Sequence, residues 1–147
     1  MNDLTKLGFL IAGIFGFIVY INLLCVLIAA WSGWRTLATR FRHEFDLRNR
    51  IPGWKSARMR WGCHYNNALK VGVSDEGLAL ATIAIVPQHA PLLIPWIEIK
   101  VLGRSKVLWW NYVRLELGSQ ERIPFTIFES LFADINRAGK LDASNLW

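Results

Sequence analysis

The stretch that decides the fold is HAPLLIPWIEIKVL, residues 89–102, which follows GLALATIAIVPQ, residues 77–88. Together the two segments form an apolar run almost long enough to cross a bilayer. Pro87, Pro91 and Pro95 interrupt it, and each proline inside a helix removes a hydrogen bond at a cost of about 3 kcal/mol. A lone segment in lipid has no partners for the freed backbone groups. We therefore expect strands of a folded domain here rather than a membrane helix.

The flanking sequence alternates between apolar and polar residues, as half-buried strands do. Residues 69–73 alternate and lead through the turn residues 74–77 into LALATIAIV, residues 78–86. Further alternation predicts strands over residues 97–101, 113–117 and 122–125, with a turn at 118–120 and the prolines in a connection and at strand starts. The inward positions are Leu69, Val71, Val73, Ile97, Ile99, Val101, Val113, Leu115 and Leu117.

The period then changes to that of a helix. Phe128, Leu131, Phe132 and Ile135 are spaced for one helical face, residues 126 and 129 fit a capping box of Thr and Glu, and Gly139 is placed to end the helix. Residues 54–139 are therefore expected to form six or seven antiparallel strands followed by one helix, and residues 140–147 a tail. The fold class is α+β.

Three segments carry a resemblance to a known fold: LKVGVSDEGLAL (69–80), PLLIPWIEI (91–99) and FESLFADINRA (128–138). In their order, this part of the chain resembles the pleckstrin-homology-like (PH-like) fold, in particular the small GRAM or bacterial PH-type domains of membrane proteins. Lipid-binding members of that family carry basic residues around the first hairpin, where this chain has Asp75 and Glu76, so the resemblance implies a fold more than a ligand. The alternative is an open, curved antiparallel sheet covered by the helix.

An uncharged segment precedes this domain. Residues 7–30 would rise about 36 Å as a helix, against roughly 30 Å of bilayer hydrocarbon. A cleaved signal peptide is the competing interpretation, but its apolar core would be about 7 to 15 residues long, and residues 28–31 match a cleavage site poorly. We expect residues 1–31 to be an uncleaved, single-pass anchor in the lipid bilayer.

The basic residues predict the orientation of that anchor. Arg35, Arg40, Arg42, Arg48 and Arg50 follow the span closely, whereas only Lys6 precedes it, and arginines near a span are retained in the cytoplasm. The N-terminus should lie outside and the domain in the cytoplasm, at the inner membrane if the source is bacterial. Cys25 and Cys63 are the only cysteines and offer no disulfide framework.

The juxtamembrane segment, residues 32–53, is basic and amphipathic. Residues 35–60 hold eight basic and two acidic residues, which accounts for the whole net charge of +6. Trp34, Leu37, Ala38, Phe41 and Phe45 form one helical stripe. The helix either lies on anionic lipid headgroups or packs its stripe on the β domain, and both interpretations stay open. The predicted membrane-surface residues are Trp31, Trp34, Arg35, Leu37, Arg40, Phe41 and Arg42.

Within the anchor, Gly8, Ala12 and Gly16 form two small-xxx-small steps, and Asn22 is an amide that a partner helix could bond. This pattern predicts a homodimer or pairing with another membrane protein.

No motif predicts a catalytic, cofactor or metal site. Cys63 and His64 are adjacent, so in a strand they point to opposite faces, and His43, His64 and His89 lack metal-ligand spacing. Trp96, Trp109 and Trp110 belong either to the core or to a partner surface. We expect a non-enzymatic accessory protein that presents its domain to a protein partner or an anionic membrane surface. The alternatives are an enzyme with an unrecognised site and, less favoured, a nucleic-acid binder using residues 35–60.

Overall fold

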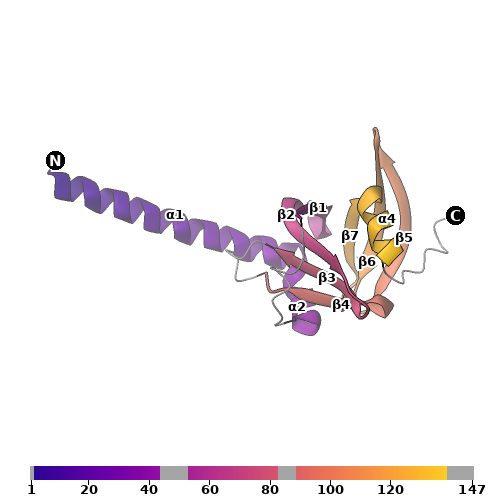
Figure 1. Ribbon diagram of the computed structural model, residues 1–147. Coiled ribbons are helices and arrows are strands. Elements are labelled where there is room, and N and C mark those ends of the chain that lie inside the picture. The colour runs from indigo at the N-terminus through magenta and orange to yellow at the C-terminus, as the bar shows by residue number, and fades with distance from the viewer. Residues whose placement is uncertain (1, 44–52, 83–88, 139–147) are drawn as a thin grey trace.

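The computed structural model describes residues 2–43, 53–82 and 89–138, and in it a long helix projects from a small β domain (Figure 1). Helix α1, Asp3–Trp31, is long and apolar enough to cross a membrane, and none of its most apolar stretch is buried by the rest of the chain. The shorter helix α2, Trp34–Phe41, follows after two residues. The helix predicted over residues 7–30 is confirmed.

Seven antiparallel strands form the domain: β1 Lys55–Arg58, β2 His64–Val73, β3 Gly77–Thr82, β4 Leu92–Pro95, β5 Ile99–Val107, β6 Trp110–Leu117 and β7 Ile123–Phe128. Their order in the sheet is β4-β3-β2-β1-β7-β6-β5. Short 3-10 turns, Arg60–Gly62 and Trp96–Glu98, connect β1 to β2 and β4 to β5. The sheet curls on itself as a half-barrel, with helix α4, Glu129–Ala138, beside it (Figure 1).

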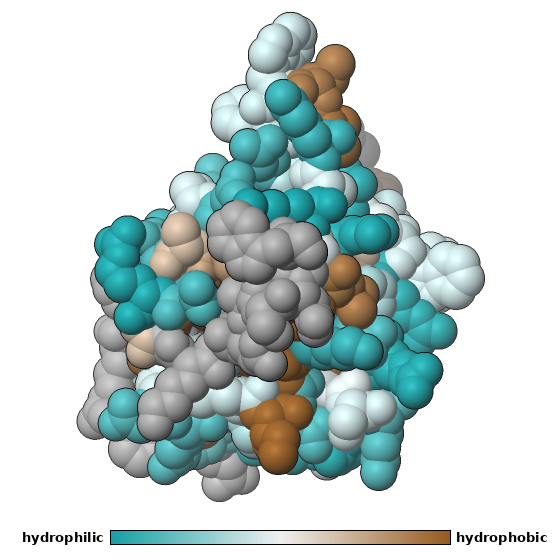
Figure 2. All heavy atoms as spheres, turned by 90° about the vertical axis from the view of Figure 1, so that its right-hand side faces the viewer, coloured by the Kyte–Doolittle hydropathy of each residue, from teal (hydrophilic) through white to brown (hydrophobic). Residues whose placement is uncertain are grey.

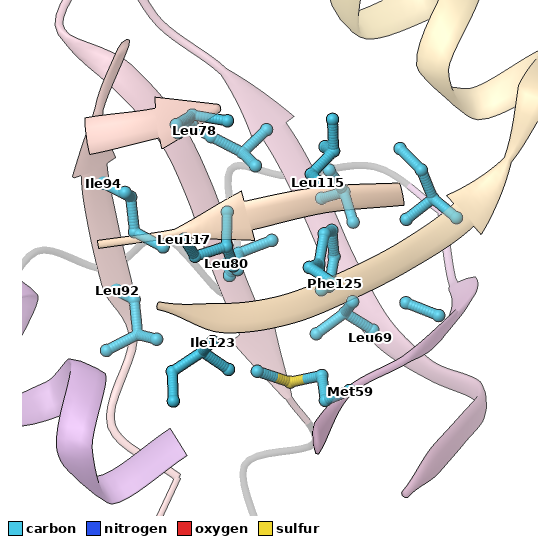
Figure 3. Packing of buried hydrophobic residues seen from close by; sticks show 14 of the residues in the cluster. Met59, Leu69, Leu78, Leu80, Leu92, Ile94, Leu115, Leu117, Ile123 and Phe125 are labelled. Atoms are coloured by element: carbon cyan, nitrogen blue, oxygen red, sulfur yellow. The ribbon is translucent and has the colours of Figure 1, made fainter. Parts of the chain in front are cut away.

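The core lies inside the curl. Leu78, Leu80, Leu92 and Ile94 from one half of the sheet face Leu115, Leu117, Ile123 and Phe125 from the other (Figure 3). All eight side chains are at most 1% exposed. Helix α4 adds Leu131, Phe132 and Ile135 to this cluster. The α+β class, the hairpin between β2 and β3, and the inward positions Val113, Leu115 and Leu117 of β6 are therefore confirmed.

Several details of the prediction were wrong. Strand β7 runs to Phe128, so Thr126 lies within a strand and does not cap the helix, and Phe128 is half-buried in the sheet rather than on the helix. Ile97 lies in the 3-10 turn and is 91% exposed, because the chain must pass from β4 to β5 across the open side of the sheet. Pro95 ends β4 rather than starting a strand.

Other predicted features lie outside the described residues. These are the second half of the predicted strand over residues 78–86, Gly139, Phe45, Pro87 and the arginines at positions 48 and 50.

Candidate functional site

The junction between α1 and the domain begins at Gly33. This residue has φ +82°, the left-handed conformation in which helices commonly end, and its carbonyl oxygen accepts a hydrogen bond of 3.0 Å from the backbone N–H of Leu37 in α2. A Cβ at position 33 would lie 2.6 Å from Cδ1 of Ile123 in the core. The chain can turn from α1 into α2 against the sheet because position 33 has no side chain.

Trp34 is the centre of the junction. Its side chain is fully buried, its Nε1–H donates a 2.9 Å hydrogen bond to the carbonyl of Ala90, and its ring lies 5.8 Å from Tyr65 and 5.2 Å from His89 between ring centroids. Leu37 and Phe41 are buried one and two turns further along α2. The whole apolar stripe of α2 therefore packs into the core of the β domain.

A chain of hydrogen bonds ties the end of α1 to the sheet. The Tyr65 hydroxyl lies 3.0 Å from Oγ of Ser32 and 2.9 Å from Nε2 of His89, and Oγ of Ser32 donates to the carbonyl of Ala29 in the last turn of α1. The Tyr65 hydroxyl donates its proton to Ser32, so it must accept a hydrogen bond from His89. We therefore assign the proton of the neutral His89 ring to Nε2. Burial raises the pKa of Tyr65 to about 12, which keeps its hydroxyl protonated in this role.

On the other side of α2, Arg40 is held by two carboxylates. Its guanidinium donates to Oε2 of Glu121 at 2.9 Å and to Oε1 of Glu98 at 3.1 Å. The hydrogen bond to Glu121 raises the pKa of Arg40. Hydrogen bonds from Ser119, one from its backbone N–H to Oε2 at 2.6 Å, lower the pKa of Glu98. The lowered pKa keeps Glu98 a charged partner for Arg40.

The chain after α2 covers an edge of the sheet. Arg42 forms a β-bridge with Leu92 of the edge strand β4, and the N–H of His43 donates a 2.9 Å hydrogen bond to the carbonyl of Pro91. Pairing of this kind protects an edge that would otherwise present free backbone groups. The helix predicted to continue beyond Phe41 ends there because Arg42 has the extended ψ of 128°.

The seven predicted membrane-surface residues thus divide into groups. Trp34, Leu37 and Phe41 are buried in the domain, which corresponds to the packing alternative, and Arg40 is ion-paired to the sheet. Trp31, Arg35 and Arg42 are exposed, and their contact with lipid stays a prediction. The predicted helix-pairing residues Gly8, Ala12 and Gly16 are exposed along α1, and Nδ2 of Asn22 bonds the carbonyl of Ile18 at 2.9 Å.

The tip of the β5–β6 hairpin carries a run of four consecutive exposed apolar side chains. The tip consists of Val107, Leu108, Trp109 and Trp110, of which Trp109 is 83% exposed. Brown and pale side chains mark this tip at the top of the domain in Figure 2, where the hairpin projects in Figure 1. Leu108 has φ +55°, a conformation that glycine or asparagine usually adopts in turns of this kind. Trp96, by contrast, is half-buried against the core and bonds the carbonyl of Ser74.

The remaining reactive residues are scattered. His89 is buried in the junction and His64 is exposed on β2. Within the ranges 2–43, 53–82 and 89–138, no three side chains of His, Cys, Asp or Glu gather as a metal site would require.

Sequence reasoning identified the stripe of α2 but not the residues that receive it. Tyr65 and His89 carry no local pattern that links them to Trp34. The Ser32-Gly33 pair between two helical patterns was the one signal that could have marked a fixed junction.

Comparison of the chain with protein-family models, with curated proteins and with solved structures finds no match. The sheet order, its curl and the C-terminal helix are compatible with a PH-like fold.

Proposed function

We propose that this protein is a single-pass, membrane-anchored accessory protein that holds a PH-like domain at the cytoplasmic face in a fixed orientation, for recognition by a protein partner. Its fold would place it with the small GRAM or bacterial PH-type domains of membrane proteins. In this role the domain catalyses no reaction; it is held in position and bound by the partner.

The observation that carries the proposal is the junction at Gly33. Trp34, Tyr65, His89 and Ser32 lock the last turn of α1 to the sheet, so that α1 and the domain are joined without a flexible linker. A rigid junction is of use when the direction of the domain relative to the membrane matters. Arg35 and Arg42 are exposed, and we propose that they bind anionic headgroups and retain this end of the anchor in the cytoplasm.

The hairpin tip is the surface that we assign to the protein partner. Two bulky apolar residues, Leu108 and Trp109, occupy a two-residue turn, although the left-handed backbone at Leu108 costs about 1 kcal/mol. Exposed aromatic residues of this kind are enriched at the centres of protein interfaces. Nothing in the fold of the domain requires them at the tip, because their side chains pack on little of it.

Topology is the first test. A reporter fused after Trp147 should be active only in the cytoplasm, because the arginines after α1 outweigh Lys6. Changing Arg35 and Arg42 to glutamate should lower the cytoplasmic fraction, and Arg104→Glu, far from the span in sequence, should not. A reporter that is active outside the cytoplasm in the unmodified protein would overturn the orientation.

Partner binding is the second test. The intact protein, crosslinked in its membrane and purified in detergent, should carry a partner at a fixed ratio. Trp109→Ser should lose that partner without lowering thermal stability. The matched control is Trp61→Ser, because Trp61 is 78% exposed but lies on the turn between β1 and β2. Equal loss of the partner in both variants, or a purified protein without any partner, contradicts the assignment.

A further inference from the structure

The outer face of the sheet, opposite the core, holds a groove of about 500 Å³. It crosses β2, β1, β7, β6 and β5 and reaches the base of the hairpin tip at Val107, but none of the junction residues Ser32, Trp34, Tyr65 and His89 lines it. Its volume is within the range of pockets that bind small molecules. The side chains that line it come from the outward positions of these strands, and the strand register arranges them in two rows.

The first row is cationic. Strand pairing places His64 opposite Arg58, Arg58 opposite Thr126, and Thr126 opposite Arg114. These four residues, the cationic row, therefore lie side by side across four neighbouring strands. Since neighbouring strands are about 4.8 Å apart, the two arginines are separated by roughly 10 Å at their Cα atoms, with the Thr126 hydroxyl between them.

The second row is aromatic and lies one pleat further along the strands. Ser105 is paired with Tyr112, and Tyr112 with Phe128. The rings of Tyr112 and Phe128 lie 5.0 Å apart at a tilt of 31°, and Trp110 meets Phe128 edge-on at 5.7 Å. We call Ser105, Tyr112 and Phe128 the aromatic row. The rings of Tyr112 and Phe128 pack on each other and form a half-buried apolar surface beside the cationic row.

The charges of the groove are unbalanced. No aspartate or glutamate lines it, and in the part of the chain that the structure describes neither Arg58 nor Arg114 forms an ion pair. Two arginines facing one groove without a carboxylate repel each other, and an anion between them removes that repulsion. Guanidinium groups bind phosphate through two parallel hydrogen bonds, and Ser56, Asn66 and Thr126 add further polar groups.

We propose that this groove binds a phosphate ester joined to a flat or apolar group. The phosphate lies between Arg58 and Arg114 on the cationic row, with the Thr126 hydroxyl donating to it. The flat or apolar group lies on Tyr112 and Phe128. A soluble aromatic phosphate and the headgroup of an anionic lipid share this chemistry. The site does not depend on the orientation of the anchor.

The test is direct binding to the full chain in detergent, with adenosine monophosphate as the probe. Arg58→Gln and Arg114→Gln should each weaken binding about tenfold or more, because each removes a charge-assisted hydrogen bond to the phosphate. Arg114→Lys should lose less, since it keeps the charge. Arg137→Gln is the control, because Arg137 is exposed on α4 and does not line the groove. The thermal melts of all four variants should match that of the unmodified protein.

Inorganic phosphate separates the two rows. Tyr112→Leu should weaken binding of adenosine monophosphate severalfold and leave the weaker binding of inorganic phosphate unchanged, whereas Arg114→Gln should weaken both. Dihexanoyl phosphatidate identifies the source of the ligand: tighter binding than the nucleotide indicates a lipid headgroup, and weaker binding a soluble phosphate.

Two results would overturn the proposal. One is the absence of binding of all three probes at millimolar concentration. The other is binding that Arg58→Gln and Arg114→Gln leave unchanged.

Discussion

Helices α1 and α2 follow one another with only Ser32 and Gly33 between them, yet their apolar side chains differ in exposure. The large apolar residues of α1 are exposed around the whole helix, whereas those of α2 lie on one face and are buried in the β domain. A helix that is apolar all round cannot be covered by contact on one side, and its surface is suited to lipid. A one-sided stripe can be covered by a sheet, and here it is.

The largest effect expected from this contrast is at the two tryptophans that flank the junction. Trp34→Ala should lower the free energy of unfolding by about 3 to 5 kcal/mol, because it leaves a cavity in the core. Trp31→Ala, at a 65% exposed residue one turn earlier, should change it by less than about 0.5 kcal/mol. Chemical denaturation of the full chain in detergent measures both. Equal effects would mean that α2 does not pack as described.

Two glycines test the turn between the helices. Gly33→Ala should cost about 2 to 4 kcal/mol, because it combines a left-handed backbone with overlap between the new methyl group and Ile123. Gly62→Ala has a similar φ of +73° with open space around it, and should cost only about 1 kcal/mol. The difference between the two variants, measured by the same denaturation, isolates the contact. A difference near zero would show that α1 and the sheet are not in contact at Gly33.

The junction should also respond to alkaline pH. The pKa of Tyr65 is about 12 in the folded protein against an ordinary value of 10.0, so its neutral form is favoured by folding. Its contribution is fully present below pH 10 and is lost as the pH rises from 10 to 12, by at most about 3 kcal/mol. Tyr65→Phe should be less stable at neutral pH but should lose less stability over this interval. If stability fell equally with pH in the two proteins, Tyr65 would not be a stabilising part of the junction.

The smallest effect belongs to the arginines of α2. Arg40→Gln should lower stability only slightly, and the loss should shrink at high salt, because the ion pairs with Glu98 and Glu121 are partly exposed. Arg35→Gln, on the exposed side of the same helix, should have no effect on unfolding. If Arg35→Gln were the more damaging change, the assignment of Arg40 to the domain and Arg35 to the membrane side would be reversed.

Much of this architecture follows from local patterns in the chain. Three patterns each predict a structure that forms among residues close in sequence. They are the uncharged run of α1, the alternation in β2 and β6, and the turn residues between β2 and β3. The same holds for the spacing of Leu131, Phe132 and Ile135, even though the start of α4 was wrong. Thr126 and Glu129 imitate a capping box, but pairing with Arg58 and Arg114 across two strands keeps Thr126 extended.

Only the tertiary structure decided what the stripe of α2 faces and which basic residues become neighbours. The sequence alone made lipid and the β domain equal candidates for Trp34, because either would bury an indole ring. The ring of His89 and the carbonyl of Ala90, both more than 50 residues away along the chain, favour the domain. In the same way, Arg58 and Arg114 are remote in sequence and become neighbours across Thr126 only when β1, β7 and β6 pair. Periodicity reports which side of an element is apolar, whereas the partner of that side is set by the pairing of distant strands.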